Sequence, residues 1–125
     1  MVRVTLLTAL ALSIASSAQA KPVVNTPVIP SAIAGADNAT CQVLNAGTKT
    51  ATVTVEIFNA NVGTLLASTA PVPLPPGIQR TLSMGGGSGG FTKFCRVTGL
   101  SKSNVTISFT EFDASSKPLM TVTAP

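Results

Sequence analysis

Apolar and polar residues alternate almost without a break over residues 50–58, which is the clearest pattern in the chain. Val53, Val55 and Ile57 fall on one face of this segment, and threonines and a glutamate fall on the other. Because successive side chains of a strand point to opposite faces of a sheet, the segment is predicted to be a strand with one buried face. Residues 104–112 alternate in the same way and predict a second strand of this kind.

Shorter strands are predicted around these two, because further apolar runs are bounded by segments rich in Gly, Pro and Asn. They cover residues 40–45, 64–70, 78–84, 91–98 and 119–123. No helical period is found in the sequence after residue 20. Short strands separated by frequent turns are typical of a sandwich of two sheets. The predicted fold class is therefore all-β, an antiparallel immunoglobulin-like β-sandwich of about seven strands, preceded by a helical signal peptide.

The connections between these strands carry their own signals. Asn/Gly segments at residues 45–47 and 59–63 predict two hairpins, which would join the strand at residues 50–58 to its neighbour on either side. Residues 71–77 are rich in proline and predict a stiff extended connector.

Two basic residues interrupt the predicted inward faces. Lys93 shares a face with Cys95, so we expect it near the strand end unless a bulge shifts the register. Arg80 falls on the predicted inward face of residues 78–84 and is expected at a rim; the apolar residues of that face are Ile78, Leu82 and Met84.

The first twenty residues have the form of a secretory signal peptide. Arg3 supplies a positive start, an apolar run extends to about residue 15, and Ala18 and Ala20 make the small-x-small end that predicts cleavage after Ala20. The apolar run is shorter than the roughly 20 residues that span a bilayer, so we expect no membrane span in the mature chain. The predicted location is secreted or periplasmic.

The expected organisation is a signal peptide at residues 1–20, an extended Pro-rich leader at 21–36 and one β-sandwich domain at 37–125. The 105 residues after the signal peptide are enough for one domain with a modest core.

Cys41 and Cys95 are the only cysteines of the chain. In an exported protein two cysteines usually form a disulfide, which here would close a loop of about 55 residues. Such a loop is worth about 4 kcal/mol in the chain-entropy model. The alternative is a pair of reactive or metal-binding thiols, which the sequence disfavours because it contains no histidine.

Charge and composition exclude several classes of function. Removal of Arg3 with the signal peptide leaves seven Lys and Arg residues against four Asp and Glu residues, a formal net charge of +3 without any basic run. Because Tyr and Trp are also absent, the sequence gives no sign of nucleic-acid binding. The absence of histidine excludes Ser-His-Asp and Cys-His catalysis and His-based copper or zinc sites. We therefore expect no enzyme activity, no metal site and no cofactor.

The acidic and hydroxyl residues allow three weaker hypotheses. Glu111 and Asp113 could form a weak cation site, although a solvated strand end is the favoured interpretation. The threonines and serines of the strands could form a flat hydroxyl array that contacts carbohydrate, although Thr is also an ordinary strand residue; they are Thr50, Thr52, Thr54, Thr106, Ser108, Thr110, Thr121 and Thr123. Asn38 and Asn104 stand in acceptor sequences for N-glycosylation, which matter only in a eukaryotic host.

Three further segments resemble a known family. They are Val43-Leu44-Asn45-Ala46-Gly47, Val53-x-Val55-x-Ile57 and Leu74-Pro75-Pro76-Gly77. Together they resemble small bacterial immunoglobulin-like modules of the CARDB type over residues 40–82. The resemblance implies a β-sandwich with an adhesive or spacer role and no reaction. The chain departs from that pattern in its two cysteines, and from antibody-type domains in lacking Trp and Tyr.

The sequence therefore predicts an exported, disulfide-linked, non-catalytic β-sandwich that acts as a binding or structural module outside the cytoplasm. The expected partner is an unknown protein or a surface glycan. The alternative is an inhibitor or regulator of a secreted enzyme, acting through a loop at residues 85–90 or 71–77.

Overall fold

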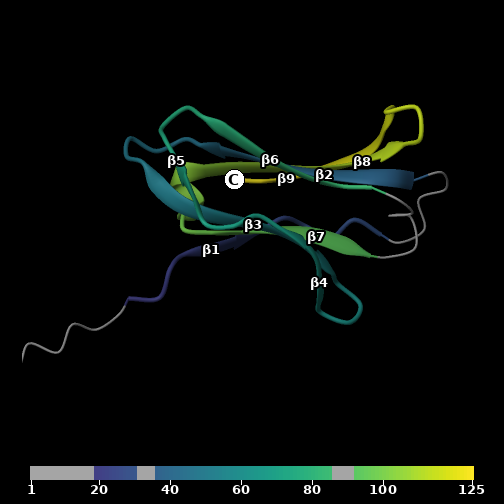
Figure 1. Ribbon diagram of the computed structural model, residues 1–125, viewed down its shortest axis with the longest axis horizontal. Helices are drawn as coiled ribbons and strands as arrows, with labels where there is room; N and C mark the ends of the chain where they lie inside the picture. Colours follow the sequence, from purple (N-terminus) through teal and green to yellow (C-terminus); the bar gives the residue numbers. More distant parts are fainter. Residues whose placement is uncertain (1–18, 31–35, 86–91) are drawn as a thin grey trace, which may run out of the picture.

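Two antiparallel sheets pack face to face and enclose a single core in the computed structural model, which describes residues 19–30, 36–85 and 92–125 (Figure 1). Residues 1–18 of the predicted signal peptide, including Ala18, and residues 86–90 of the glycine loop lie outside the described residues. Sheet A contains β1 (Val23–Asn25), β7 (Lys93–Thr98), β3 (Ala51–Asn59) and β4 (Thr64–Ser68), with β5 (Val72–Leu74) also paired to β3. Sheet B contains β6 (Gln79–Met84), β2 (Ala36–Asn45), β8 (Val105–Asp113) and β9 (Pro118–Ala124).

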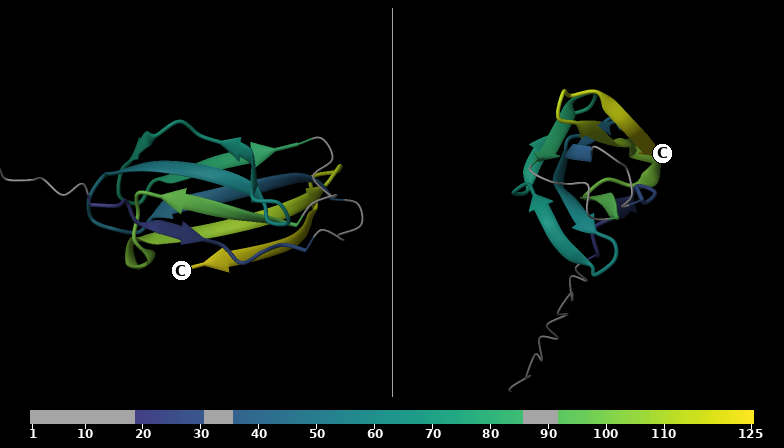
Figure 2. Two further views of the ribbon diagram at one scale, coloured as in Figure 1. Left: turned by 90° about the horizontal axis from the view of Figure 1, so that it is seen from below. Right: turned by 90° about the vertical axis from the view of Figure 1, so that its right-hand side faces the viewer.

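The predicted antiparallel arrangement of two sheets is confirmed, with nine strands in the described part of the chain rather than about seven. The two additional strands, β1 and β5, have three residues each and lie in segments that the sequence assigns to the leader and the connector. Proline-containing segments this short can still pair where the proline nitrogen faces away from the ladder. The segment from β1 to Ile29 also supplies Val24 and Ile29 to the core. Figure 2 shows β1 lying along the edge of sheet A beside β7.

The predicted hairpin at residues 45–47 is wrong. β2 pairs with β6 and β8 in sheet B, whereas β3 pairs with β4, β5 and β7 in sheet A. The segment between them crosses from one sheet to the other, because the apolar faces of β2 and β3 are buried against each other across the core. The second predicted hairpin is confirmed: β3 pairs with β4, and Gly63 in the turn has a φ of 69°.

The core is formed by the inward faces that alternation predicts. Val53, Val55 and Ile57 of β3 are fully buried, and so are Ile107 and Phe109 of β8. Leu82 and Met84 of β6 pack against this core, but Ile78 is 51% exposed and the prediction that it faces inward is wrong. Ile78 precedes β6, so the alternation of that strand does not extend to it.

The predicted disulfide is confirmed. Cys41 of β2 and Cys95 of β7 are bonded, and both are fully buried. Their Cα atoms lie 6.1 Å apart and they are separated by 54 positions in the sequence. Because β2 belongs to sheet B and β7 to sheet A, the bond joins the two sheets through the middle of the core.

A buried ion pair lies close to the disulfide. Lys93 begins β7, as the sequence predicts, and its side chain is completely buried together with that of Glu111 on β8. Lys93 Nζ and Glu111 Oε1 are 2.6 Å apart. The favoured interpretation of Glu111 as a solvated residue at a strand end is therefore wrong. Glu111 continues the inward face of Ile107 and Phe109, and its charge is compensated by a lysine on the opposite sheet.

Candidate functional site

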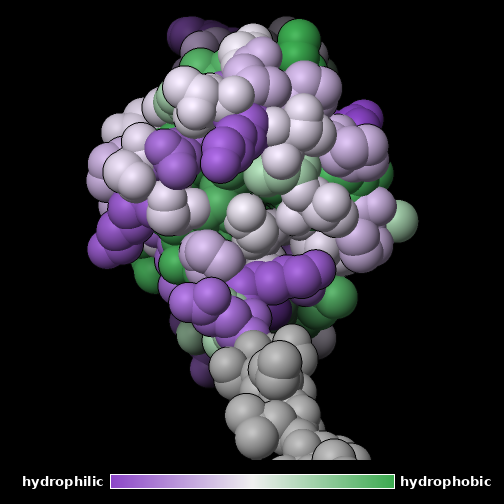
Figure 3. Space-filling view, turned by 90° about the vertical axis from the view of Figure 1, so that its left-hand side faces the viewer, coloured by the Kyte–Doolittle hydropathy of each residue, from purple (hydrophilic) through white to green (hydrophobic). Residues whose placement is uncertain are grey.

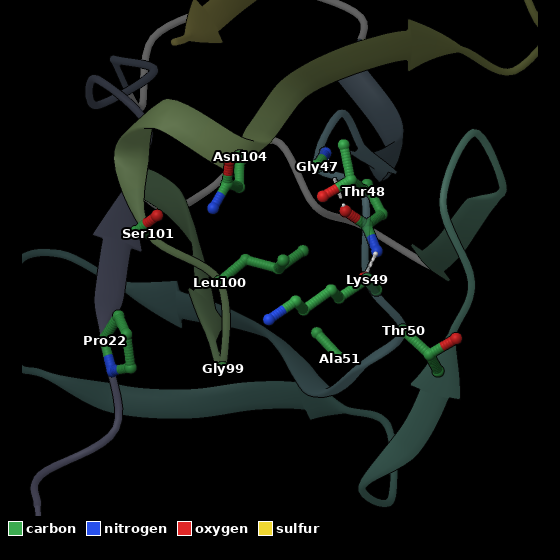
Figure 4. Close-up of a pocket in the computed structure, with 11 residues that line it drawn as sticks. Pro22, Gly47, Thr48, Lys49, Thr50, Ala51, Gly99, Leu100, Ser101 and Asn104 are labelled. Atoms are coloured by element: carbon green, nitrogen blue, oxygen red, sulfur yellow. Dashed lines mark hydrogen bonds between the residues drawn. The ribbon is translucent and has the colours of Figure 1, made fainter.

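A pocket of about 410 Å³ opens at the end of the sandwich from which the N-terminal segment leaves (Figures 3 and 4). One wall is the segment between β2 and β3, and the other is the connection between β7 and β8, which contains a short 3-10 helix at Lys102–Asn104. The lining residues are Pro22, Asn45, Gly47, Thr48, Lys49, Thr50, Ala51, Gly99, Leu100, Ser101 and Asn104.

Asn45 fixes the first wall of the pocket. Its side chain is buried, and its Nδ2 donates hydrogen bonds to the carbonyl oxygens of Lys49, at 2.9 Å, and Leu74, at 2.8 Å. Its Oδ1 accepts a hydrogen bond from the Gly47 nitrogen at 2.9 Å. A buried amide with three hydrogen bonds holds the loop in one conformation, because each group would lose a partner if the loop opened. The same side chain ties this loop to the Pro-rich segment that contains β5.

Gly99 fixes the second wall. It has a φ of 109°, and a Cβ atom placed on it would lie 2.1 Å from the carbonyl oxygen of Thr52. The Gly99 nitrogen also donates a hydrogen bond of 2.9 Å to the Pro22 carbonyl oxygen. The backbone of this wall therefore packs directly against β3 and is tied to the N-terminal segment. Both walls are held before any ligand arrives.

Replacement of Gly99 by Ala is expected to destabilise the domain by about 1–3 kcal/mol, because the new Cβ clashes with backbone and the positive φ is strained. Chemical denaturation followed by circular dichroism measures the change. Gly63→Ala is the matched control, since Gly63 also has a positive φ but nothing lies within 4 Å of its Cβ position. Equal destabilisation of the two variants would show that the close approach to Thr52 does not matter.

The pocket has an apolar floor and a polar rim. Leu100, Ala51 and Pro22 supply apolar surface, and Leu100 is only 5% exposed. Figure 4 shows the Lys49 side chain extending across the pocket toward Leu100, while Thr50 points away from it. In Figure 3, apolar residues show between hydrophilic ones at this end of the molecule.

Lys49 and Asn104 leave hydrogen-bonding capacity in the pocket. Within residues 19–30, 36–85 and 92–125, neither the Lys49 ammonium nor the Asn104 side-chain amide takes part in a hydrogen bond or an ion pair. No carboxylate is found in the described lining. A cation and an amide that face an apolar surface without an acidic neighbour are suited to bind an acceptor group brought by a ligand.

The four acidic residues lie away from this pocket and have partners of their own, including Asp37, whose Oδ2 accepts a hydrogen bond from Asn38 Nδ2 at 3.2 Å. Glu111 is paired with Lys93, and Glu56 Oε2 lies 2.9 Å from Nε of Arg96. Asp113 Oδ1 accepts hydrogen bonds from the backbone nitrogens of Ser115 and Lys117, and so holds the turn between β8 and β9. Glu111 is directed into the core and Asp113 into this turn, so the two do not face a common cation site. No cluster of three potential metal ligands is found among the described residues.

The outer face of sheet A contains a packed aromatic and charged cluster. Phe58 and Phe94 stack with their ring centroids 5.5 Å apart, and the Arg96 guanidinium lies 4.1 Å from the centroid of Phe58. Arg96 also makes the ion pair with Glu56. Phe94 faces outward because it alternates with the inward-facing Lys93 and Cys95, and this cluster shields it in part. Because the rings, the guanidinium and the carboxylate already interact with one another, the cluster is suited to stabilise the fold and leaves little free for a ligand.

Part of the predicted hydroxyl array exists on the outer face of sheet B. Thr40 is opposite Ser83 on one side and Thr110 on the other, and Thr110 is opposite Thr121, so one row crosses four strands. The Thr40 and Ser83 hydroxyls are 3.1 Å apart and those of Thr110 and Thr121 are 2.9 Å apart. The threonines of β3 belong to sheet A and are not part of this face. These four hydroxyls bond to one another in two pairs, so this row has less unused hydrogen-bonding capacity than the pocket.

The structure describes both predicted glycosylation sites and the Pro-rich segment. Asn104 is exposed at the rim of the pocket, and Asn38 donates a hydrogen bond to Asp37. Glycosylation at either residue stays a prediction. The Pro-rich segment at residues 71–77 is held to the body of the domain, because Leu74 and Gly77 bond to Asn45.

Neither a family model, nor a curated protein, nor a solved structure matches the chain. The CARDB-like resemblance therefore stays a prediction. Among the described residues, no helix has the length and apolar character needed to cross a membrane. The site must accordingly be interpreted from its own geometry.

The sequence did not single out the pocket, because its residues come from three distant segments. Lys49 and Leu100 look like ordinary loop residues along the chain, and Asn104 stands out only as part of a glycosylation acceptor sequence. The available signals were Asn45, a polar residue at the end of an apolar strand, and Gly99, a glycine directly after a strand. Both mark places where the backbone needs special support, but neither indicates what lies opposite.

Proposed function

We propose that the protein is an exported, non-catalytic binding module that holds a small ligand in the pocket between residues 46–51 and 99–104. The observation that supports this most directly is a pocket held open by Asn45 and Gly99, with the Lys49 ammonium directed into it. Its volume falls within the range of small-molecule sites, which is about 300–1,000 Å³. Its lining contains a lysine and several hydroxyl groups, but no histidine, cysteine or carboxylate that would activate them for proton transfer or attack on a substrate.

Export is supported by two independent features. The first twenty residues have the composition of a signal peptide, and the disulfide between Cys41 and Cys95 requires an oxidising compartment for lasting stability. A buried disulfide that links the two sheets suits a small domain that must persist outside the cytoplasm.

The alternative is an inhibitor or regulator of a secreted enzyme. Residues 71–77 were one candidate for the inhibitory loop. Their anchoring to Asn45 and the pairing of β5 with β3 give them a fixed shape, which an inhibitor loop also requires. The pocket at residues 46–51 and 99–104 offers a direct site for a small ligand, and this favours the small-ligand function.

The proposal predicts a localised response to small ligands. Isotope-labelled protein beginning at Lys21 is screened against a library of small molecules by two-dimensional amide NMR. We expect at least one compound to shift the amide signals of residues 46–51 and 99–104, and to be recovered chemically unchanged.

Ala51→Phe, which fills the pocket, is expected to abolish the response. Ala114→Phe in the exposed turn between β8 and β9 is the matched control and should leave the response intact. A compound converted to a product would contradict a non-catalytic module. Amide shifts that all lie outside the pocket would contradict this site. Tight inhibition of a secreted protease by the Ala51→Phe variant would instead favour the inhibitor function.

A further inference from the structure

The positive charge of the domain is concentrated at the pocket end. Lys49 is part of the lining, and Lys102 belongs to the 3-10 helix between the lining residues Ser101 and Asn104. Lys21 directly precedes Pro22, another lining residue. Arg80 lies near the start of β6, opposite Val43. The ladder between β2 and β6 ends at the next pair, Leu44 and Gln79, directly before Asn45.

The side-chain carboxylates of the described residues do not balance these cations. Asp37 and Asp113 lie at the opposite end of the sandwich, where β2 begins and β8 ends. Glu111 and Glu56 are used by Lys93 and Arg96. The surplus of positive charge therefore stands at the end that contains the pocket, where it attracts anions and disfavours cations.

The pocket itself presents one cation beside an apolar floor. The Lys49 ammonium supplies a single positive charge and the Asn104 amide supplies a neutral donor, whereas the Ser101 hydroxyl is already hydrogen-bonded to that of Ser103 at 3.1 Å. A group with two negative charges, such as phosphate, usually needs several cations or a set of converging backbone N–H groups. A single carboxylate matches one ammonium and one amide, and the floor of Leu100, Ala51 and Pro22 can bury an apolar body attached to it.

We propose that the pocket binds an organic monocarboxylate. The carboxylate accepts hydrogen bonds from Lys49 Nζ and the Asn104 amide, and the apolar part of the ligand lies against Leu100. This inference rests on the proposed function, because it names the ligand class of the same pocket. A free organic acid and the C-terminal carboxylate of a peptide present this chemistry equally, and the test below distinguishes them.

The first test compares hexanoate with hexanamide, which has the same shape but no charge. Each is titrated into isotope-labelled protein beginning at Lys21, and the amide signals of residues 46–51 and 99–104 report binding. We expect hexanoate to shift these signals with an affinity about tenfold or more above that of hexanamide, which is the ratio that a charge-assisted hydrogen bond provides.

The second test replaces the cation. Lys49→Met keeps the aliphatic length of the side chain and removes the charge, so it should weaken hexanoate binding about tenfold and leave hexanamide binding almost unchanged. Lys102→Met removes a charge from the same end outside the lining, and it should weaken hexanoate binding less than about threefold, since exposed charges are screened. Lys117→Met at the opposite end should have no effect.

The outcomes separate this inference from the proposed function. Equal binding of hexanoate and hexanamide in the pocket would overturn the monocarboxylate and leave a binding module in place. Equal effects of Lys49→Met and Lys102→Met would overturn the direct contact with Lys49. An absence of shifts in the pocket with either probe would overturn the monocarboxylate, while the library screen with Ala51→Phe decides the proposed function by itself.

A peptide that ends in leucine, with a free or an amidated C-terminus and an acetylated N-terminus, identifies the source of the carboxylate. Binding of the free-ended peptide alone, with an affinity equal to or above that of hexanoate, would assign the site to peptide C-termini. Binding of hexanoate alone would assign it to free organic acids. Binding of the amidated peptide at full strength would contradict the proposal.

Discussion

Lys93→Met is expected to destabilise the domain by about 3–5 kcal/mol, although methionine fills a similar volume. The substitution leaves the Glu111 carboxylate inside the core, where its side chain is 1% exposed and has lost the ammonium beside it. A buried charge without a partner is costly because water no longer solvates it. Urea denaturation followed by circular dichroism measures the difference.

The double variant Lys93→Met with Glu111→Leu is the decisive control. It removes both charges and keeps the site filled, so its stability should return to within about 1–2 kcal/mol of the parent protein or exceed it. Lys117→Met, a substitution of the same type on the surface, should have little effect. If the double variant is as unstable as Lys93→Met, then the loss comes from packing and not from the unpaired carboxylate.

Cys41→Ser and Cys95→Ser are each expected to destabilise the domain by about 2–5 kcal/mol. The disulfide links positions that are 54 residues apart, so its loss frees a long loop in the unfolded chain, and each serine places a hydroxyl in a fully buried site. Urea denaturation without reductant measures both variants. Their midpoints should be similar, because each removes the same bond.

The double variant Cys41→Ser with Cys95→Ser tests this explanation further. Since either single substitution already breaks the bond, the second should add much less than the first. Additive losses would mean that burial of the serine hydroxyls dominates. Midpoints equal to that of the parent protein would mean that the bond contributes nothing to stability.

Local alternation predicted the inward faces of the long strands. The pattern of Val53, Val55 and Ile57 is sufficient because a strand has a period of two and one face is buried. The disulfide was also predictable, since only one pairing of two cysteines exists. Both features depend on neighbouring positions or on simple counting.

Pairing between strands could not be deduced in the same way. The Asn/Gly segment after β2 looks like a hairpin turn, yet the chain there passes from sheet B to sheet A. A turn signal specifies a change of direction but not which sheet accepts the next strand. The three side-chain hydrogen bonds of Asn45 replace the ladder that a hairpin would have supplied.

Glu111 shows the same limit for burial. The alternation of β8 places it inward, and a lone carboxylate would normally argue against that position. The compensating ammonium of Lys93 stands on the opposite sheet and is invisible to any local pattern. The sequence offers one indication of the pair: Lys93 and Glu111 each place a charge of opposite sign on an otherwise apolar inward face. The pocket depends on contacts of this non-local kind throughout.

The mass of the intact protein from the extracytoplasmic fraction of its host, measured with and without reduction and alkylation, tests the central claim most directly. An exported sandwich with joined sheets predicts a chain that begins at Lys21, is lighter by two hydrogen atoms before reduction, and takes up alkylating agent at Cys41 and Cys95 only after reduction. An unprocessed chain confined to the cytoplasm, or two thiols that alkylate freely without reductant, would contradict it.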